Sequence, residues 1–122
     1  MSDNKLITVI DDDESMRLSL EGLVRSLGYS VQVFACAEDF LAAGGDARAA
    51  CVISDIKMPG MSGIDLLDRL KETGRRVPVI LMTAFANDAA RTRATKAGAA
   101  CFLSKPFDAQ SLIDCLDQAL GN

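Results

Sequence analysis

Acidic side chains follow two of the apolar segments of this chain. Asp11 and Asp12 come directly after the apolar run KLITVI, and Asp55 directly follows CVIS. Thr83 and Lys105 stand at the ends of two later apolar runs. If these residues converge, two carboxylates about 4 Å apart repel by about 4 kcal/mol at an effective dielectric of about 20. A hard cation such as Mg²⁺, which prefers to share a phosphate, or a lysine would relieve that repulsion. The joint placement therefore predicts a metal-dependent phosphate site.

Each of these residues alone has an ordinary structural explanation. Acidic residues at the start of a helix cap it and favour its dipole, which would account for Asp12, Asp13 and Glu14. Asp55 fits that explanation less well, because the turn-rich segment IKMPG follows it instead of a helical pattern. Thr83 and Lys105, taken singly, are a common turn hydroxyl and a common solvated lysine. Only their placement together at the ends of strands favours chemistry.

The chain has no histidine, which excludes several kinds of chemistry. It removes the commonest general base and the Ser-His-Asp triad. Without histidine or a C-x-x-C pair, the cysteines do not form a typical zinc site. We expect all four to be reduced thiols that pack as small apolar side chains: Cys36, Cys51, Cys101 and Cys115.

Length and composition indicate one folded domain. A chain of 122 residues holds a single domain, and its 49% hydrophobic and 25% charged residues are typical of a globular core. The net charge of -4 and the lack of a basic stripe oppose nucleic-acid contact by this segment. The sequence shows no secretory signal and no apolar run of membrane-spanning length, so we expect no membrane association and a cytoplasmic location.

Five short apolar segments alternate with five helical patterns. The expected strands are 5–10, 30–34, 51–54, 78–82 and 100–104, and the expected helices are 16–27, 37–43, 63–73, 87–97 and 108–120. Short strands that are continuously apolar are typical of a sheet covered by helices on both faces. The sequence therefore predicts an α/β fold, a (βα)5 doubly wound five-stranded parallel sheet. Ligands of such sheets bind beyond the carboxyl ends of the strands.

Two helices carry informative local signals. Ser62 followed by Asp65 forms a capping-box pattern at the start of the third helix. The helix at 87–97 has almost only alanine at its apolar positions, so we expect it to be weakly anchored.

Four motifs in order give the chain a family resemblance over essentially its whole length. They are VIDDDES at 9–15, SDIKMPGMSGIDLL at 54–67, ILMTAFA at 80–86 and FLSKPF at 102–107. The chain resembles the receiver domains of two-component response regulators, the CheY-like superfamily with a flavodoxin-like fold. Within it, the chain is most similar to FixJ-like receivers, which usually precede a helix-turn-helix DNA-binding domain. The resemblance implies that residues 1–122 are one receiver domain, expected as the N-terminal part of a longer regulator.

The resemblance implies a phosphoacceptor and a metal site. Asp55 would accept the phosphoryl group. Asp11 and Asp12 would hold Mg²⁺, with Mn²⁺ as a substitute, helped by the Asp55 carboxylate and the backbone carbonyl of Lys57.

The resemblance also implies phosphoryl-binding and switch residues. Thr83 would bind the phosphoryl group through its hydroxyl, Ala84 through its backbone N–H, and Lys105 through its ammonium. Pro106 would follow a cis peptide bond from Lys105, the type of bond where that isomer is tolerated. Phe102 matches the switch aromatic, which could fill the space left when Thr83 moves inward.

The implied function is phosphoacceptance from a sensor histidine kinase. Such a domain is not an enzyme beyond catalysing its own phosphorylation and dephosphorylation. The expected output is a changed surface on the fourth helix, fifth strand and fifth helix that controls transcription, and homodimerisation on phosphorylation would suit it.

Two positions depart from the family pattern. Cys36 stands where relatives often have a serine cap, so the second helix should begin less firmly, and a redox role for Cys36 is the weaker interpretation. Phe85 is bulkier than the residue in many relatives, and we expect it to shield the acyl phosphate from water.

Other function classes remain to be weighed. The first alternative is a receiver-fold interaction module that works without phosphorylation. The second is an Asp-nucleophile hydrolase, but Lys57 stands where such enzymes usually place their acid–base aspartate. The third is a nucleotide-binding flavodoxin-like domain, which the missing glycine-rich phosphate loops oppose.

Overall fold

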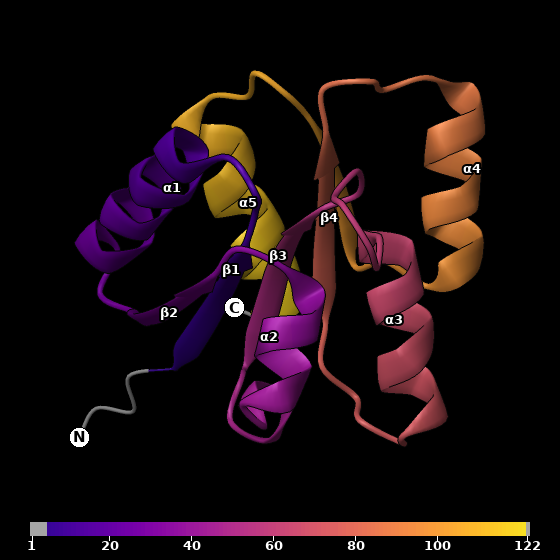
Figure 1. The fold of residues 1–122 in the computed structure, drawn as a ribbon. Helices are drawn as coiled ribbons and strands as arrows, with labels where there is room; N and C mark the ends of the chain where they lie inside the picture. Colours follow the sequence, from indigo (N-terminus) through magenta and orange to yellow (C-terminus); the bar gives the residue numbers. More distant parts are fainter. Residues whose placement is uncertain (1–4, 122) are drawn as a thin grey trace.

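The chain folds into one five-stranded parallel sheet with helices on both faces (Figure 1). The structure is a computed structural model and describes residues 5–121. The elements in chain order are β1 (Leu6–Ile10), α1 (Glu14–Ser26), β2 (Ser30–Phe34), α2 (Ala37–Ala42), a 3-10 helix (Gly45–Ala47), β3 (Cys51–Asp55), α3 (Gly63–Glu72), β4 (Val79–Thr83), α4 (Asp88–Ala97), β5 (Cys101–Ser104) and α5 (Ala109–Leu120). The strand order β2-β1-β3-β4-β5 confirms the predicted doubly wound fold.

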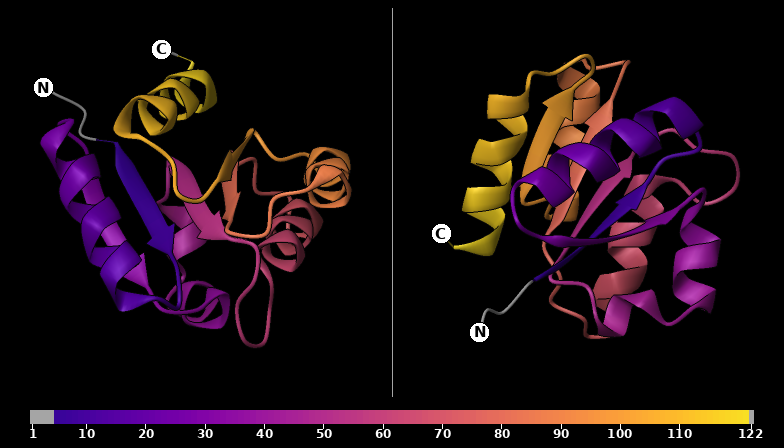
Figure 2. Two further views of the ribbon diagram at one scale, coloured as in Figure 1. Left: turned by 90° about the horizontal axis from the view of Figure 1, so that it is seen from above. Right: turned by 90° about the vertical axis from the view of Figure 1, so that its left-hand side faces the viewer.

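Two apolar layers hold the helices on the sheet. Figure 2 shows the sheet with helices on either side of it. The layer under α1 and α5 contains Ile7, Val9, Leu20, Val24, Leu112 and Leu116. The layer under α2, α3 and α4 contains Ile10, Phe40, Leu66, Leu70, Leu81 and Ala94. Adjacent residues of a strand face opposite sides, so a strand buried on both faces must be apolar at nearly every position. This explains why the inner strands β1, β3 and β4 read as nearly continuous apolar runs in the sequence.

The element boundaries differ from the predicted ones by a few residues at most. Asp55 and Thr83 are the last residues of β3 and β4, whereas the sequence pattern placed both just beyond their strands. Both residues pair with a neighbouring strand, so each strand extends to include them. Hydropathy alone does not indicate such pairing at a polar residue. The 3-10 helix at Gly45–Ala47 was not predicted.

The helix starts agree with the sequence signals. Ser62 and Asp65 form the predicted capping box of α3. Cys36 occupies the first cap of α2 and makes no side-chain cap hydrogen bond, as expected from the missing serine. Only alanines of α4 are buried, and Lys71 Nζ donates to the last-turn carbonyl of Ala97 at 2.9 Å. Apolar packing therefore anchors α4 weakly, while Lys71 ties its C-terminal end to α3.

The expectation that all four cysteines are reduced is wrong for two of them. Cys101 in β5 and Cys115 in α5 form a disulfide, with their Cα atoms 5.8 Å apart. Both side chains belong to the layer between the sheet and α5, so packing of α5 onto β5 brings them together. Cys36 and Cys51 are free, and burial raises the pKa of the Cys51 thiol to about 12, which keeps it unreactive.

Reducing this disulfide is expected to destabilise the domain. A cross-link over 14 residues restricts the unfolded chain, and a loop of this size stabilises by about 3 kcal/mol. Urea unfolding of the wild type with and without a thiol reductant measures the effect. A Cys101→Ser, Cys115→Ser double variant should not respond to reductant, and Cys36→Ser should respond like the wild type. A wild type of equal stability in both buffers would contradict the expectation.

Among the helices between residues 5 and 121, none has the length and apolar character needed to cross a lipid bilayer.

Candidate functional site

The strand register places the predicted site residues at one edge of the sheet. Ile10 pairs with Ser54 of β3, so Asp11 follows β1 next to Asp55. Thr83 of β4 pairs with Ser104 of β5, so Lys105 follows directly beside Thr83. This edge is the carboxyl end of the strands, and the strand order reverses between β1 and β3. Crevices at such switch points are the usual binding sites of open parallel sheets.

Lys105 bridges two aspartates from different strands. Its Nζ donates to Asp11 Oδ2 at 2.9 Å and to Asp55 Oδ2 at 3.0 Å. Asp11 is fully buried and Asp55 is 8% exposed. One ammonium therefore neutralises part of the charge of two nearly buried carboxylates, the arrangement that the repulsion between them requires.

Asp11 is also held by its own loop and by α1. Its Oδ1 accepts from Asp13 N–H at 2.9 Å, and its backbone carbonyl accepts from the Arg17 guanidinium at 2.8 Å. Asp13 itself caps α1, because its carboxylate accepts from the N–H groups of Ser15 and Met16. The capping explanation is therefore confirmed for Asp13. Sequence reasoning missed the contact of Arg17, which no spacing signal indicated.

Burial and ion pairing shift the pKa values of Asp55 and Lys105. Burial raises the pKa of Asp55 above its ordinary value, and the hydrogen bond and charge of Lys105 offset only part of that shift. Burial also opposes the charged form of Lys105, but Asp11 and Asp55 outweigh it and hold the Lys105 pKa above its ordinary value. The two carboxylates thus stabilise the charged form of Lys105, while burial destabilises the ionised form of Asp55.

Asparagine in place of Asp55 is expected to stabilise the metal-free fold at pH 7. The folded-state pKa of Asp55 lies above its ordinary value of 3.8, so the ionised carboxylate lowers stability above that pH. This loss of stability is absent below pH 3.8, where Asp55 is protonated in both the folded and the unfolded state. It is complete above the raised pKa of the folded state. Asp55→Asn should therefore be more stable than the wild type at pH 7, with a smaller difference in acid.

Urea unfolding in chelator at neutral and acidic pH measures this difference. Asp68→Asn, at an exposed position of α3, is the matched control and should change little at either pH. Equal or lower stability of Asp55→Asn at pH 7 would show that Asp55 carries no such penalty.

Three carboxylates at this edge could hold a cation. Oxygen atoms of Asp11, Asp12 and Asp55 all lie within 4.8 Å of one another. Oxygen donors gathered in this way suit a hard divalent cation such as Mg²⁺. The loop after β3 is tied to the same place, since Lys57 N–H donates to Asp55 Oδ1 at 3.3 Å. The donor chemistry therefore fits the metal that the sequence predicted.

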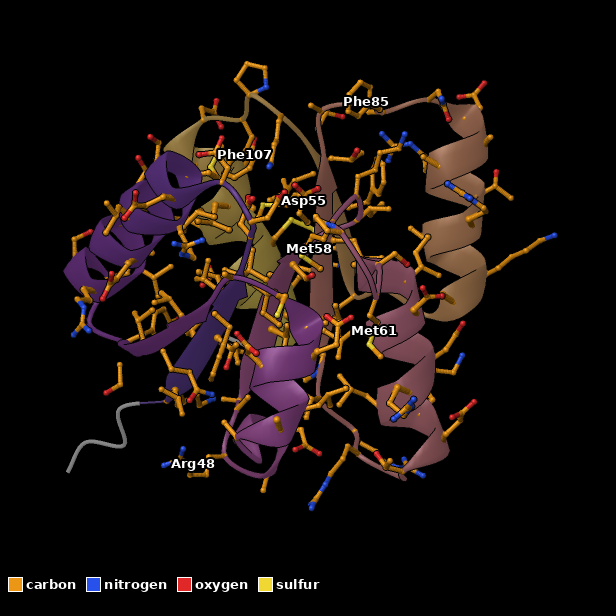
Figure 3. All side chains as sticks on the ribbon, viewed as in Figure 1. Arg48, Asp55, Met58, Met61, Phe85 and Phe107 are labelled. Carbon is orange, nitrogen blue, oxygen red and sulfur yellow. A yellow bond between two sulfur atoms is a disulfide. The ribbon has the colours of Figure 1, made fainter. Side chains whose placement is uncertain are left out.

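Thr83 and Phe85 lie on the β4 side of the site. The Thr83 side chain is buried, and its hydroxyl oxygen accepts from Phe85 N–H at 3.0 Å. The Phe85 ring is 63% exposed, and Lys57 Nζ lies 4.8 Å from its centroid. Figure 3 shows Phe85 on the loop between β4 and α4, above Asp55 at the upper end of the sheet. The exposed ring and Lys57 thus join the two loops that border the acidic site. Ala84, which lies between Thr83 and Phe85 in the chain, is exposed.

The remaining predicted residues lie on β5 and just after it. The peptide bond between Lys105 and Pro106 is cis. The Phe102 ring is partly buried, and the Arg91 guanidinium of α4 lies 4.8 Å from its centroid. Phe102 therefore contacts the weakly anchored helix, on the opposite side of β5 from the disulfide.

Comparison with protein families gives a match to one family model. Residues 7–117 match the response regulator receiver domain. The chain is 39% identical to the transcriptional regulatory protein FixJ of Azorhizobium caulinodans, covering 99% of this chain and 57% of that protein. It is 38% identical to the response regulator protein TodT of Pseudomonas putida, covering 98% of this chain and 53% of that protein. The chain thus spans about half the length of these curated relatives.

Solved structures with the same fold include two related proteins. The FixJ-N crystal structure superposes with a TM-score of 0.89 at 33% identity, covering 100% of this chain and 97% of that one. The response regulator StyR superposes with a TM-score of 0.88 at 39% identity, covering 98% of this chain and 60% of that one.

Proposed function

This chain belongs to the response regulator receiver domain family of two-component signalling, and from that premise we propose that Asp55 is its phosphoacceptor. The observation that carries the proposal is the bridge from Lys105 to both Asp11 and Asp55 at the carboxyl edge of the sheet. A neutral carboxyl would be a poor nucleophile, and the ammonium 3.0 Å from Asp55 favours the ionised form.

Mg²⁺ is the proposed cofactor, with Mn²⁺ as a substitute. Asp11, Asp12 and Asp55 would hold it through carboxylate oxygens, and Lys57 through its backbone carbonyl. When bound, the ion would neutralise charge on the phosphoryl oxygens. The close carboxylates support this assignment, because their mutual repulsion favours binding of a cation.

The proposed reaction moves one phosphoryl group from a sensor histidine kinase to Asp55. A carboxylate oxygen of Asp55 attacks phosphorus, and the phosphorus–nitrogen bond of the donor phosphohistidine breaks. No proton must be removed from an ionised carboxylate, which is why a chain without histidine can perform the step. Lys105, the Thr83 hydroxyl and the Ala84 N–H would stabilise charge on the transferred group, which is the main requirement of phosphoryl transfer. The domain would thus catalyse only its own phosphorylation and dephosphorylation.

The proposed output is a changed surface on α4, β5 and α5. A new phosphoryl group adds strong hydrogen-bond acceptors beside Thr83. Thr83 would turn inward, away from Phe85 N–H, and Phe102 would follow into the vacated space. The weak packing of α4 allows it to respond. Homodimerisation of this surface and control of transcription by a C-terminal DNA-binding domain complete the proposal, with no nucleic-acid contact by residues 1–122. The proposed location is the cytoplasm, where a sensor kinase would act as the donor.

Intact mass after incubation with acetyl phosphate and Mg²⁺ tests the proposal. We expect one added phosphoryl group in the wild type, and none with EDTA or in Asp55→Asn. Acetate release is measured alongside, because it would detect phosphorylation followed by hydrolysis too fast for the phosphorylated protein to accumulate. A wild type that binds Mg²⁺ yet neither gains mass nor releases acetate would contradict phosphoacceptance. That result would favour an interaction module that works without phosphorylation.

Alanine in place of Phe85 is expected to shorten the life of the acyl phosphate several-fold. The exposed ring and Lys57 would lie over the modified Asp55 and limit the approach of water. The rate of mass loss after removal of the donor measures the lifetime. Leu18→Ala, another exposed large apolar side chain, should leave the lifetime unchanged. An equal lifetime in Phe85→Ala and the wild type would show that the ring shields nothing.

A further inference from the structure

A side chain of α2 reaches the loop that follows Asp55. Glu38 Oε2 accepts a hydrogen bond from Met61 N–H at 2.8 Å, between residues 23 positions apart. Figure 3 shows Met61 between α2 and α3. Glu38 belongs to the first turn of α2 and is exposed, so hydrophobic burial does not explain its placement.

A turn at Gly60 lies next to the Glu38 carboxylate. Gly60 has a φ of 78°, a left-handed conformation that favours glycine. A Cβ on Gly60 would displace the end of the Glu38 side chain. The turn at Gly60 thus lets the carboxylate approach the main chain and directs the next N–H group, that of Met61, toward it.

The loop held by Glu38 is also fixed at both of its ends. Gly63 N–H donates to the Ile56 carbonyl at 3.0 Å, which closes the base of the loop. Lys57 N–H donates to Asp55 Oδ1 at 3.3 Å, which connects the loop to the acidic site. The Glu38 contact holds Met61, near the end of the loop that lies away from Asp55 in the sequence. Only three residues separate Met61 from Lys57, so a movement of Met61 would also move the Lys57 backbone.

The charge of Glu38 strengthens this contact. The Met61 N–H is the main reason that the pKa of Glu38 lies below its ordinary value. The acceptor is therefore ionised at neutral pH, and hydrogen bonds to ionised acceptors are stronger than neutral ones. Neighbouring Asp39 has the same charge and is also exposed, but no hydrogen bond or ion pair joins its carboxylate to the residues at 5–121.

We propose that Glu38 is a positioning residue for the phosphoacceptor site, acting through Met61 and the loop at 56–62. By tying this loop to α2, Glu38 keeps the backbone of Lys57 beside Asp55, where its carbonyl can bind the cation. The inference rests on the proposed function, because it assigns Glu38 a role in that same reaction. Glu38 contacts the loop main chain and acts on the reacting atoms only through it.

Three variants separate the hydrogen bond from general effects on the fold. Glu38→Ala removes the acceptor, Glu38→Gln retains an oxygen that can accept from Met61 N–H, and Asp39→Ala removes the same charge one residue away. We expect Glu38→Ala to weaken Mg²⁺ binding about tenfold, a typical loss for a group that supports a metal ligand, and to slow phosphoryl uptake. Glu38→Gln should recover most of both, and Asp39→Ala should match the wild type.

Three measurements decide the inference: Mg²⁺ affinity by calorimetry, uptake from acetyl phosphate by intact mass, and amide exchange of a peptide spanning 57–62. Amide exchange needs no metal, and we expect it to be faster in Glu38→Ala alone. Unchanged affinity and exchange in Glu38→Ala, beside an active wild type, would overturn the role of Glu38 and leave the proposed function intact. Glu38→Gln and Asp39→Ala both as defective as Glu38→Ala would also overturn it, because the negative charge at the start of α2, and not the hydrogen bond to Met61, would then matter. A wild type that takes up no phosphoryl group would contradict the proposed function itself, and the positioning role with it.

Discussion

Replacing Lys105 by methionine is expected to slow phosphoryl uptake by ~10²-fold or more, the usual loss when one preorganised charge-stabilising group is removed. Lys105 Nζ lies 2.9 Å from Asp11 and 3.0 Å from Asp55, so the variant loses the cation that faces both carboxylates. Methionine has a similar length and fills similar space, which limits the change to charge and hydrogen bonding. The initial rate of mass gain with acetyl phosphate and saturating Mg²⁺ measures the effect.

Lys96→Met is the matched control for this prediction. Lys96 is an exposed lysine in the last turn of α4, away from the acidic site. Its loss changes the net charge by the same amount, so any general effect of charge on the anionic donor appears in both variants. A rate for Lys105→Met close to that of Lys96→Met would show that Lys105 does not take part in the reaction.

Alanine at Gly63 is expected to destabilise the domain by about 1–3 kcal/mol, the usual cost of overpacking a full core. Gly63 is the first residue of α3 and is buried against β3. A Cβ there would collide with the Asp55 backbone carbonyl and would lie 3.0 Å from Leu81 Cδ2. Because the first obstacle is backbone, relief requires a shift of α3 or of Asp55. We therefore expect slower phosphoryl uptake as well as a lower urea midpoint.

Gly22 provides a control in which the same substitution acts in the opposite direction. It lies within α1, and no heavy atom would lie within 4 Å of an added Cβ. Alanine is the better helix former, so Gly22→Ala should stabilise by about 0.5–1 kcal/mol and leave uptake unchanged. Equal stability changes at Gly22 and Gly63 would contradict a close packing of α3 on β3.

The fold and the convergence of the acidic residues could be predicted from sequence because both depend on local pattern. Apolar runs buried on both faces alternate with helical periodicity, and parallel strands bring their carboxyl ends to one edge. Asp11, Asp55, Thr83 and Lys105 follow from that rule alone, and the structure brings Asp11, Asp55 and Lys105 into direct contact. Capping of α3 by Ser62 was predictable for the same reason, since its signal spans four residues.

Contacts that depend on how one element packs on another could not be predicted in this way. The disulfide requires Cys101 and Cys115 to face each other across the layer between β5 and α5, and their spacing resembles no cysteine motif. The Glu38 contact depends on the left-handed turn at Gly60 and on the position of α2 beside the loop. Both contacts are set by tertiary structure, and the sequence around each residue contains no motif that predicts its partner.

The position of the phosphoryl group in the wild type is the most direct measurement of the proposed function. After incubation with acetyl phosphate and Mg²⁺, borohydride reduction converts an aspartate that carries an acyl phosphate into homoserine, and peptide sequencing by mass spectrometry locates it. We expect homoserine at position 55 and unmodified aspartate at positions 11 and 12. Homoserine at another position, or none in a protein that has gained one phosphoryl group, would contradict the assignment of Asp55 as the phosphoacceptor.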